Sequence, residues 1–144
     1  DALKKELENT NSFLCEFVKY IGFTKEQILQ AVSGRTDGST SNLQDKIQRA
    51  IDEKINTPFE SFYTVEKVTL KARFTTNILS FTVSTDSGST MTLGERSDGL
   101  RWYLNLFIDV MANNLPSRQV VYLFDEPGIS LHVNAQKKLL KPKF

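Results

Sequence analysis

The sequence of 144 residues has one cysteine, one histidine and no long apolar run. Because Cys15 is the only thiol, the chain can form neither an intrachain disulfide nor a cysteine-ligated zinc site. A helix that crosses a membrane needs about 18 consecutive apolar residues, and no segment comes near that length. No signal peptide opens the chain. We therefore predict a cytoplasmic protein that does not enter a membrane.

A strong excess of charge of either sign is also missing. The chain has 18 Lys and Arg against 17 Asp and Glu, so its net charge of +1 gives no overall attraction to nucleic acid or membrane. Hydrophobic residues make up 40% and charged residues 24%, as in a soluble globular domain with one core. The chain begins at Asp1 without a methionine, and we expect it to be a fragment of a larger protein.

A phosphate-binding loop is the third absence. Residues 34–40 combine glycine with hydroxyl side chains, but Gly38 stands where such a loop needs a lysine to reach the outer phosphates. No other stretch supplies that lysine. We interpret residues 33–41 as a flexible connection between helices.

The stretch that is most informative is the apolar run of residues 120–124, which is followed by Asp125, Glu126 and Pro127. A continuous apolar run predicts a parallel strand buried on both faces. Ligands collect at the carboxyl ends of such strands, and two carboxylates there suit Mg²⁺ and phosphate chemistry. The alternative is a buried strand that leads into a solvated acidic turn.

A second informative stretch, residues 93–100, opens a helical pattern. Ser97 is a favourable N-cap, and Asp98 and Gly99 would begin the first turn. Free amides and the positive end of the dipole make such a helix start an anion site. The alternative is an ordinary capped helix. The apolar positions of the pattern are Leu100, Tyr103, Leu104, Phe107, Ile108 and Met111.

Together these stretches resemble two motifs of ABC-type ATPases, in the order and at about the spacing of that family. Ser97-x-Gly99 resembles the signature motif, and residues 120–127 resemble the Walker B segment with its catalytic glutamate. The resemblance covers roughly residues 59–140 and is to the second lobe of the ATPase head. It is closest to the AAA-like ATP-binding proteins and the overcoming-lysogenization-defect (OLD) nucleases, with relatives among the RecF, RecN and chromosome-maintenance proteins.

Three positions depart from the transporter members of the family. Asp98 replaces the usual glycine, Leu100 replaces the usual glutamine, and His132 stands where transporters have aspartate. A Leu-His pair after Asp-Glu-Pro is familiar in the OLD-like branch. These departures favour that branch over a transport ATPase.

The resemblance implies a role for each site residue. Asp125 would hold Mg²⁺ through water, and Glu126 would polarise the attacking water. Ser97, with Asp98 and Gly99, would contact ATP bound to a second head, supported by Arg96. Ser130 and His132 would lie in the D-loop at the dimer seam. For His132, packing or a hydrogen bond is favoured over metal binding, and for Trp102 an interface or core position over base stacking.

The implied fold is mixed α/β, of the α+β kind. Residues 1–58 would form a helical arm, and residues 59–144 the C-terminal lobe of the head, without the lobe that carries Walker A. In the arm we predict one amphipathic helix or short coiled coil over residues 3–21, ended by Gly22. A capping box at Thr24 and Gln27 opens a second helix, and a third over residues 43–55 is interrupted by Pro58.

In the lobe we predict an antiparallel meander, the signature helix and the Walker B strand. Alternating residues 68–74 and the run 78–83 give two strands joined by a turn at residues 76–77, and residues 91–93 a short third strand. Residues 134–140 read as a helix. Its end carries Lys137, Lys138, Lys141 and Lys143, which we interpret as solvated, with DNA contact as the alternative.

The resemblance implies that the complete protein hydrolyses ATP between two heads and uses this cycle in DNA repair or phage defence. The isolated chain should bind Mg-ATP very weakly and hydrolyse none. Two alternatives stay open: a non-enzymatic dimerisation module of the same fold, and a transport ATPase subunit.

Overall fold

The computed structural model describes residues 2–95, 98–113, 121 and 123. These residues form a mixed α+β fold with a three-stranded antiparallel sheet of order β1-β2-β3. Its elements are α1 (Ala2–Glu8), α2 (Phe13–Ile21), α3 (Lys25–Ala31), α4 (Gly38–Ile51), the π-helical segment η1 (Asp52–Asn56), α5 (Thr57–Phe62), β1 (Val68–Thr75), β2 (Ile78–Thr85), β3 (Thr90–Thr92), the 3-10 turn η2 (Leu93–Glu95) and α6 (Asp98–Asn113).

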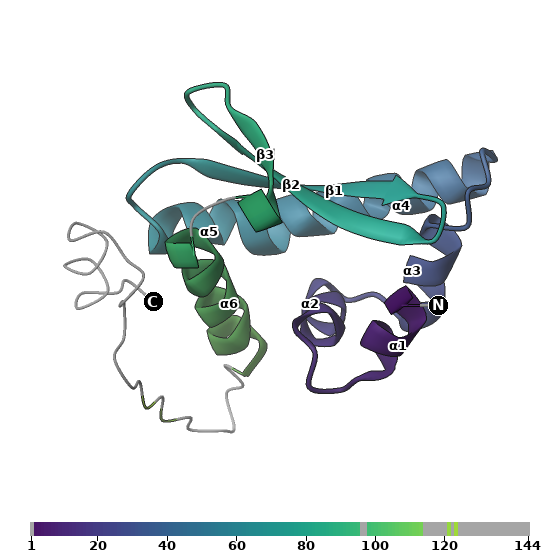
Figure 1. The fold of residues 1–144 in the computed structure, drawn as a ribbon, viewed down its shortest axis with the longest axis horizontal. Helices are drawn as coiled ribbons and strands as arrows, with labels where there is room; N and C mark the ends of the chain where they lie inside the picture. Colours follow the sequence, from purple (N-terminus) through teal and green to yellow (C-terminus); the bar gives the residue numbers. More distant parts are fainter. Residues whose placement is uncertain (1, 96–97, 114–120, 122, 124–144) are drawn as a thin grey trace.

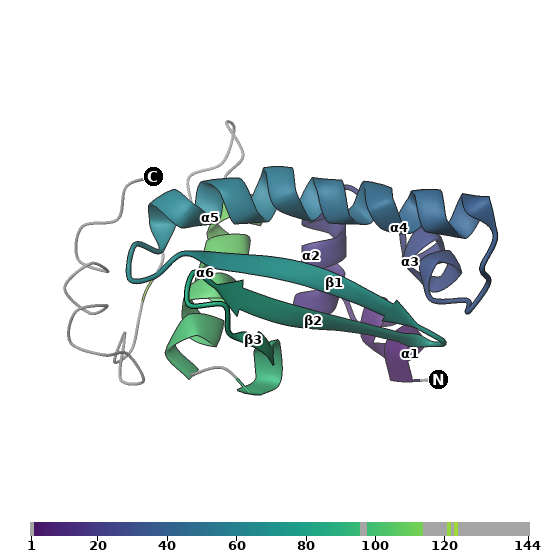
Figure 2. The same ribbon diagram turned by 90° about the horizontal axis from the view of Figure 1, so that it is seen from above.

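The elements lie in two layers. The sheet and the long helix formed by α4, η1 and α5 make the upper layer, and α1, α2 and α6 lie beneath them (Figure 1). Seen from above, the long helix runs along β1, at the edge of the sheet (Figure 2). Among the described residues, no helix is both long and apolar enough to cross a membrane.

The first helical segment is broken in two, so the prediction of one helix over residues 3–21 is wrong. Four short polar residues, 9–12, separate α1 from α2, and such side chains compete with helical hydrogen bonds. The Ser12 hydroxyl accepts a hydrogen bond from Cys15 N at 3.1 Å and thereby caps α2. The predicted end of α2 at Gly22 (φ 89°) and the Thr24 capping box of α3 are both confirmed.

The predicted loop at residues 33–41 is shorter than expected, because α4 already begins at Gly38. Asp37 caps this helix, and its Oδ1 accepts a hydrogen bond from Thr40 N at 2.8 Å. The hydrogen bond from Thr40 N lowers the pKa of the Asp37 carboxyl. Asp37 is therefore the N-cap of α4, a role that the prediction of a flexible connection over residues 33–41 does not include.

The long helix continues through Pro58, so the predicted interruption there is also wrong. Pro58 has no N–H to donate to the carbonyl four residues earlier, Lys54 O. The Tyr20 hydroxyl donates to that carbonyl instead, at 2.9 Å. The helix widens at the same place, because Thr57 N bonds to Asp52 O, five residues back, in η1. In return, Lys54 Nζ donates to the carbonyl of Ile21 at the end of α2, at 3.1 Å.

The predicted strands and turn are confirmed. β1 and β2 pair antiparallel from Val68 opposite Thr85 to Thr75 opposite Ile78, which leaves residues 76–77 as a two-residue turn. Asn77, the second residue of the turn, has a left-handed φ of 60°, and its N–H donates to Val32 O at 2.8 Å. The short third strand is β3, which pairs with β2.

Side-chain amides of the long helix complete the hydrogen bonds of the β1 edge. Asn56 Oδ1 accepts from Leu70 N at 2.8 Å, and Asn56 Nδ2 donates to Leu70 O at 2.9 Å. About two helical turns earlier, Gln48 Oε1 accepts from Ala72 N at 2.9 Å. Asp52 Oδ1 lies between the two amides and accepts from both, at 2.9 and 2.7 Å. The helix therefore takes the place of a neighbouring strand.

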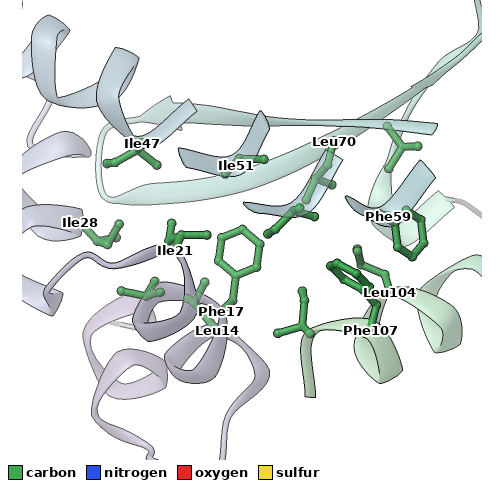
Figure 3. Close-up of a cluster of buried hydrophobic side chains, with 14 of the residues drawn as sticks. Leu14, Phe17, Ile21, Ile28, Ile47, Ile51, Phe59, Leu70, Leu104 and Phe107 are labelled. Carbon is green, nitrogen blue, oxygen red and sulfur yellow. The ribbon is translucent and has the colours of Figure 1, made fainter. Parts of the chain in front are cut away.

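A single apolar core lies between the two layers (Figure 3). It draws buried side chains from the helices before residue 58 and from the sheet and α6 after it, so the described packing is continuous across that residue. The division into an arm and a lobe stays a prediction. The side chains labelled in Figure 3 are Leu14, Phe17, Ile21, Ile28, Ile47, Ile51, Phe59, Leu70, Leu104 and Phe107.

The predicted Walker B strand lies outside the described residues, apart from Val121 and Leu123. Both of these side chains are exposed, at 82% and 92%, and neither residue belongs to a strand. The predicted burial is therefore wrong at these two positions. A buried parallel strand needs parallel neighbours and a covering layer, and the described sheet contains only antiparallel pairs. The helix predicted for residues 134–140 lies outside the described part of the chain.

The edge pairing predicts a large effect for Asn56→Ala. This substitution leaves Leu70 N–H buried without its acceptor, which typically costs about 1–3 kcal/mol of unfolding free energy. Urea denaturation followed by circular dichroism measures this cost. Asn42→Ala on the same helix is the matched control, because Asn42 is exposed and forms no side-chain hydrogen bond with a described residue. Equal stability of the two variants would contradict the structural role of the pairing.

Candidate functional site

The structure describes two of the predicted site residues, Asp98 and Gly99. Both lie at the start of α6, where the signature motif was expected to open a helix, so the helix start is confirmed. Gly99 is buried, whereas the Asp98 side chain is 69% exposed. The remaining predicted residues lie outside the described part of the chain: Arg96, Ser97, Asp125, Glu126, Ser130 and His132.

The helix start carries an ion pair that the sequence analysis did not foresee. Arg101 Nη2 and Asp98 Oδ1 are in contact, one turn apart on the exposed face of α6. A carboxylate at this end of a helix interacts favourably with the helix dipole. It also competes with any external anion for the same positive potential. Arg101 offsets this competition in part, because its guanidinium balances the charge of Asp98.

Glu95 links the 3-10 turn η2 to the end of β3. Its Oε2 accepts hydrogen bonds from Thr92 N and from Thr92 Oγ1, both at 2.8 Å. The hydrogen bond from Thr92 N, followed by that from the hydroxyl, lowers the pKa of the Glu95 carboxyl. The predicted site residues do not include Glu95. The Thr-x-x-Glu spacing of residues 92–95 is the signal that could have identified it, since it matches a capping box.

An aromatic cluster anchors α6 to α5. Phe107 packs edge-on against Phe59, with ring centroids 5.3 Å apart, and Tyr103 packs against Tyr63 at 5.0 Å. Phe62 contacts both α6 rings, at 5.8 and 5.4 Å. Burial raises the pKa of the Tyr103 hydroxyl. Because two turns of α6 are held in this way, the direction of its N-terminus is fixed by α5.

Trp102 lies on the other side of α6. Its ring meets Tyr103 edge-on at 5.5 Å, and its side chain is half-buried. It lines an open groove of about 320 Å³ between α2 and α6. The predicted interface or core position of Trp102 agrees with this half-buried setting. The other residues that line the groove are Asn11, Phe13, Glu16, Asn105, Leu106 and Asp109.

The described residues alone offer an exposed helix start and no metal-binding group. Within ranges 2–95 and 98–113, no three His, Cys, Asp or Glu side chains come together as metal ligands. The predicted Mg²⁺ ligand Asp125 lies beyond these ranges. Comparison with family models, with curated proteins and with solved structures finds no match.

The aromatic anchor predicts that Phe107→Ala weakens the attachment of α6. Removing a buried phenylalanine ring typically costs about 3–5 kcal/mol of unfolding free energy. Urea denaturation measures the loss, and near-ultraviolet circular dichroism reports the altered environment of the neighbouring aromatic rings. Asn105→Ala on the exposed face of α6 should stay within about 0.5 kcal/mol of the wild type. A similarly small loss for Phe107→Ala would rule out the anchor.

The lowered pKa of Glu95 predicts a pH-dependent contribution to stability. A carboxyl with a lower pKa in the folded state stabilises the fold above its unfolded pKa of about 4.3 and loses this effect as pH falls through the folded value. Glu95→Gln should therefore lower the melting temperature near neutral pH and differ less from the wild type in acid. Melting curves across this range test the trend. Glu53→Gln, an exposed residue without a side-chain hydrogen bond to a described residue, is the control and should show no such convergence.

Proposed function

We propose that this chain is the C-terminal lobe of an ABC-type ATPase head of the OLD-like branch. The complete protein would bind ATP between two heads and couple its hydrolysis to work on DNA, in repair or in phage defence. In this proposal the phosphate-binding loop is supplied by a second lobe, and the head partner brings the nucleotide to the start of α6.

The observation that carries the proposal is the position at which α6 begins. The helix starts at Asp98, directly after Ser97 and with Gly99 in its first turn, as the signature motif requires. Its first residue is exposed to solvent, so a phosphate on a second subunit could approach the helix amides. The aromatic cluster packs the following turns of this helix against α5, and Glu95 bonds to Thr92 at the end of the preceding strand.

The residues at the start of α6 suit an anion better than a metal cation. The helix start supplies amides and a positive dipole, and Arg101 adds a guanidinium one turn away. Ser97 and Gly99 would contact the γ-phosphate of ATP, with support from Arg96. Asp125 would hold Mg²⁺ through water, and the ion would neutralise charge on the phosphates. Glu126 would accept a proton from the attacking water.

The test uses Ser97→Arg in the complete protein, in a Glu126→Gln background. Glu126→Gln should slow turnover by about a hundredfold or more and trap ATP-bound head dimers. Ser97→Arg should abolish these dimers, because a long cationic side chain fills the space that the phosphate must enter. Size-exclusion chromatography with light scattering, with and without ATP, measures the dimer.

Asn105→Arg is the matched control, since it adds the same side chain to the exposed face of the same helix. It should leave the ATP-dependent dimer intact. Thermal melting checks that both variants fold, because loss of an N-cap alone costs about 1 kcal/mol. Normal dimerisation of a folded Ser97→Arg variant would reduce Ser97 to a helix cap and overturn the proposed signature role.

A non-enzymatic dimerisation module of the same fold is the second candidate. The observation that favours it is the Asp98 carboxylate, which places a negative charge at the helix start where a phosphate would come. In that case Glu126→Gln would leave function in the complete protein unchanged. Measuring ATP turnover by the complete protein, with and without Glu126→Gln, therefore separates the two candidates.

A further inference from the structure

The outward face of the sheet is built from residues that alternate with the core residues of β1. Val68 and Leu70 point into the core, so Thr69, Lys71 and Arg73 lie on the opposite face. The register places Thr82 opposite Lys71, and Ser80 opposite Arg73. β3 extends the same face, because Thr92 pairs with Thr82 and Thr90 with Ser84. In the view from above, no described helix covers this face (Figure 2).

Cationic and hydroxyl side chains make up nearly all of this face. Lys71 and Arg73 are exposed, and neither side chain forms a hydrogen bond or ion pair with a described residue. Lys67 continues the row at the entrance to β1. The accessible hydroxyl residues of the face are Thr69, Thr75, Ser80, Ser84, Thr90 and Thr92, Thr82 between them is buried, and the one apolar residue is Ile78, at the hairpin end.

Among the described residues, the carboxylates near this face lie at its edges. Glu60 pairs with Lys67 at 3.4 Å at one end, and Glu95 bonds to Thr92 beside β3. The strands themselves carry no acidic residue between Val68 and Thr85. The whole chain has a net charge of only +1. Lys71 and Arg73, which pair with no described carboxylate, therefore make the middle of this face locally more positive than the chain as a whole.

We propose that this face, centred on Lys71 and Arg73, binds the sugar–phosphate backbone of double-stranded DNA without reading its sequence. Lysine and arginine neutralise phosphates, and serine and threonine hydroxyls donate hydrogen bonds to phosphate oxygens. Proteins that hold single strands stack the bases on aromatic side chains, and this face has no aromatic residue. Apart from Lys71 and Arg73, the strand residues of the face are mostly short hydroxyl residues, so the face offers contacts to phosphates and no row of long polar side chains that could read successive base edges.

An anionic membrane is the main competing partner for a cationic face. Peripheral membrane binding combines cations with apolar side chains that enter the acyl region. Here only Ile78, 57% exposed, could do so, and it lies at the tip of the hairpin, away from the centre of the face. The chemistry of the face therefore favours a polyanion that offers phosphates in solution.

The test measures binding of the whole chain to a fluorescein-labelled duplex of mixed sequence, by fluorescence anisotropy at several low salt concentrations. The double variant Lys71→Glu/Arg73→Glu should bind about tenfold or more weakly, because two phosphate contacts become repulsive. The slope of log affinity against log salt should also become shallower by about 2. Circular dichroism checks that the variant is folded. The double variant Lys71→Gln/Arg73→Gln shows how much DNA affinity is lost when the two positive charges are removed without adding negative ones.

The matched control is Lys46→Glu/Arg49→Glu on the exposed side of α4, which changes the net charge by the same amount. Its affinity should stay within about threefold of the wild type. Equal losses for the two double variants would reduce the binding to net charge and overturn the proposal. So would absence of wild-type binding to the duplex, or binding only to vesicles that contain phosphatidylserine. The DNA-binding test needs neither ATP nor a second lobe. A negative result would therefore reject DNA binding by this face without bearing on the proposed ATPase function.

Discussion

The described structure depends on the pairing of side-chain amides with the backbone of β1. An edge strand has a row of backbone N–H and C=O groups without a neighbouring strand. In a stable fold, these groups are covered by another element or hydrogen-bonded to solvent. The Asn56 side chain forms hydrogen bonds with both the N–H and the C=O of Leu70, and the Gln48 side chain accepts one from Ala72 N–H. These two side-chain amides therefore provide the hydrogen bonds that a neighbouring strand would otherwise form. This pairing fixes the long helix at the height of the sheet, and both then cover the same core from above.

The position of the candidate site follows from this arrangement through α5. Because α5 continues the helix held against β1, the same pairing positions the aromatic side chains on which α6 packs. α6 in turn carries Asp98 and Gly99 in its first turn. In the proposed function, this preorganised packing of α6 would suit a surface that meets phosphate on another subunit.

Local patterns were enough to predict the meander, the capping box and the start of α6, because their determinants lie within a few residues. The helix through Pro58 could not be predicted in this way. The hydroxyl that satisfies Lys54 O comes from Tyr20, 34 residues away, and a proline in a helical pattern otherwise indicates a stop. The i,i+3 spacing of Asp98 and Arg101 could have indicated their ion pair, and the apolar pattern did indicate a buried Phe107, but neither shows that Phe107 packs on Phe59 of α5. For Asp125 and Glu126, which lie outside the described residues, the resemblance alone supports the assignment.

The π-helical turn also sets the phase of the long helix. Residues 48 and 56 of a regular α-helix would point about 80° apart, since each residue turns the chain by about 100°. The widened turn η1 compensates for this rotation, so Gln48 and Asn56 both reach β1. Loss of one residue from this segment would restore a regular α-helix, in which Gln48 and Asn56 are seven residues apart and still point within about 20° of each other. An extra residue would instead add about 100° of rotation and turn either Asn56 or the aromatic face of α5 away from its partner. Residues 52–56 should therefore tolerate an insertion far less well than the turn at residues 86–89, where the chain can grow without rotating anything that follows in the core.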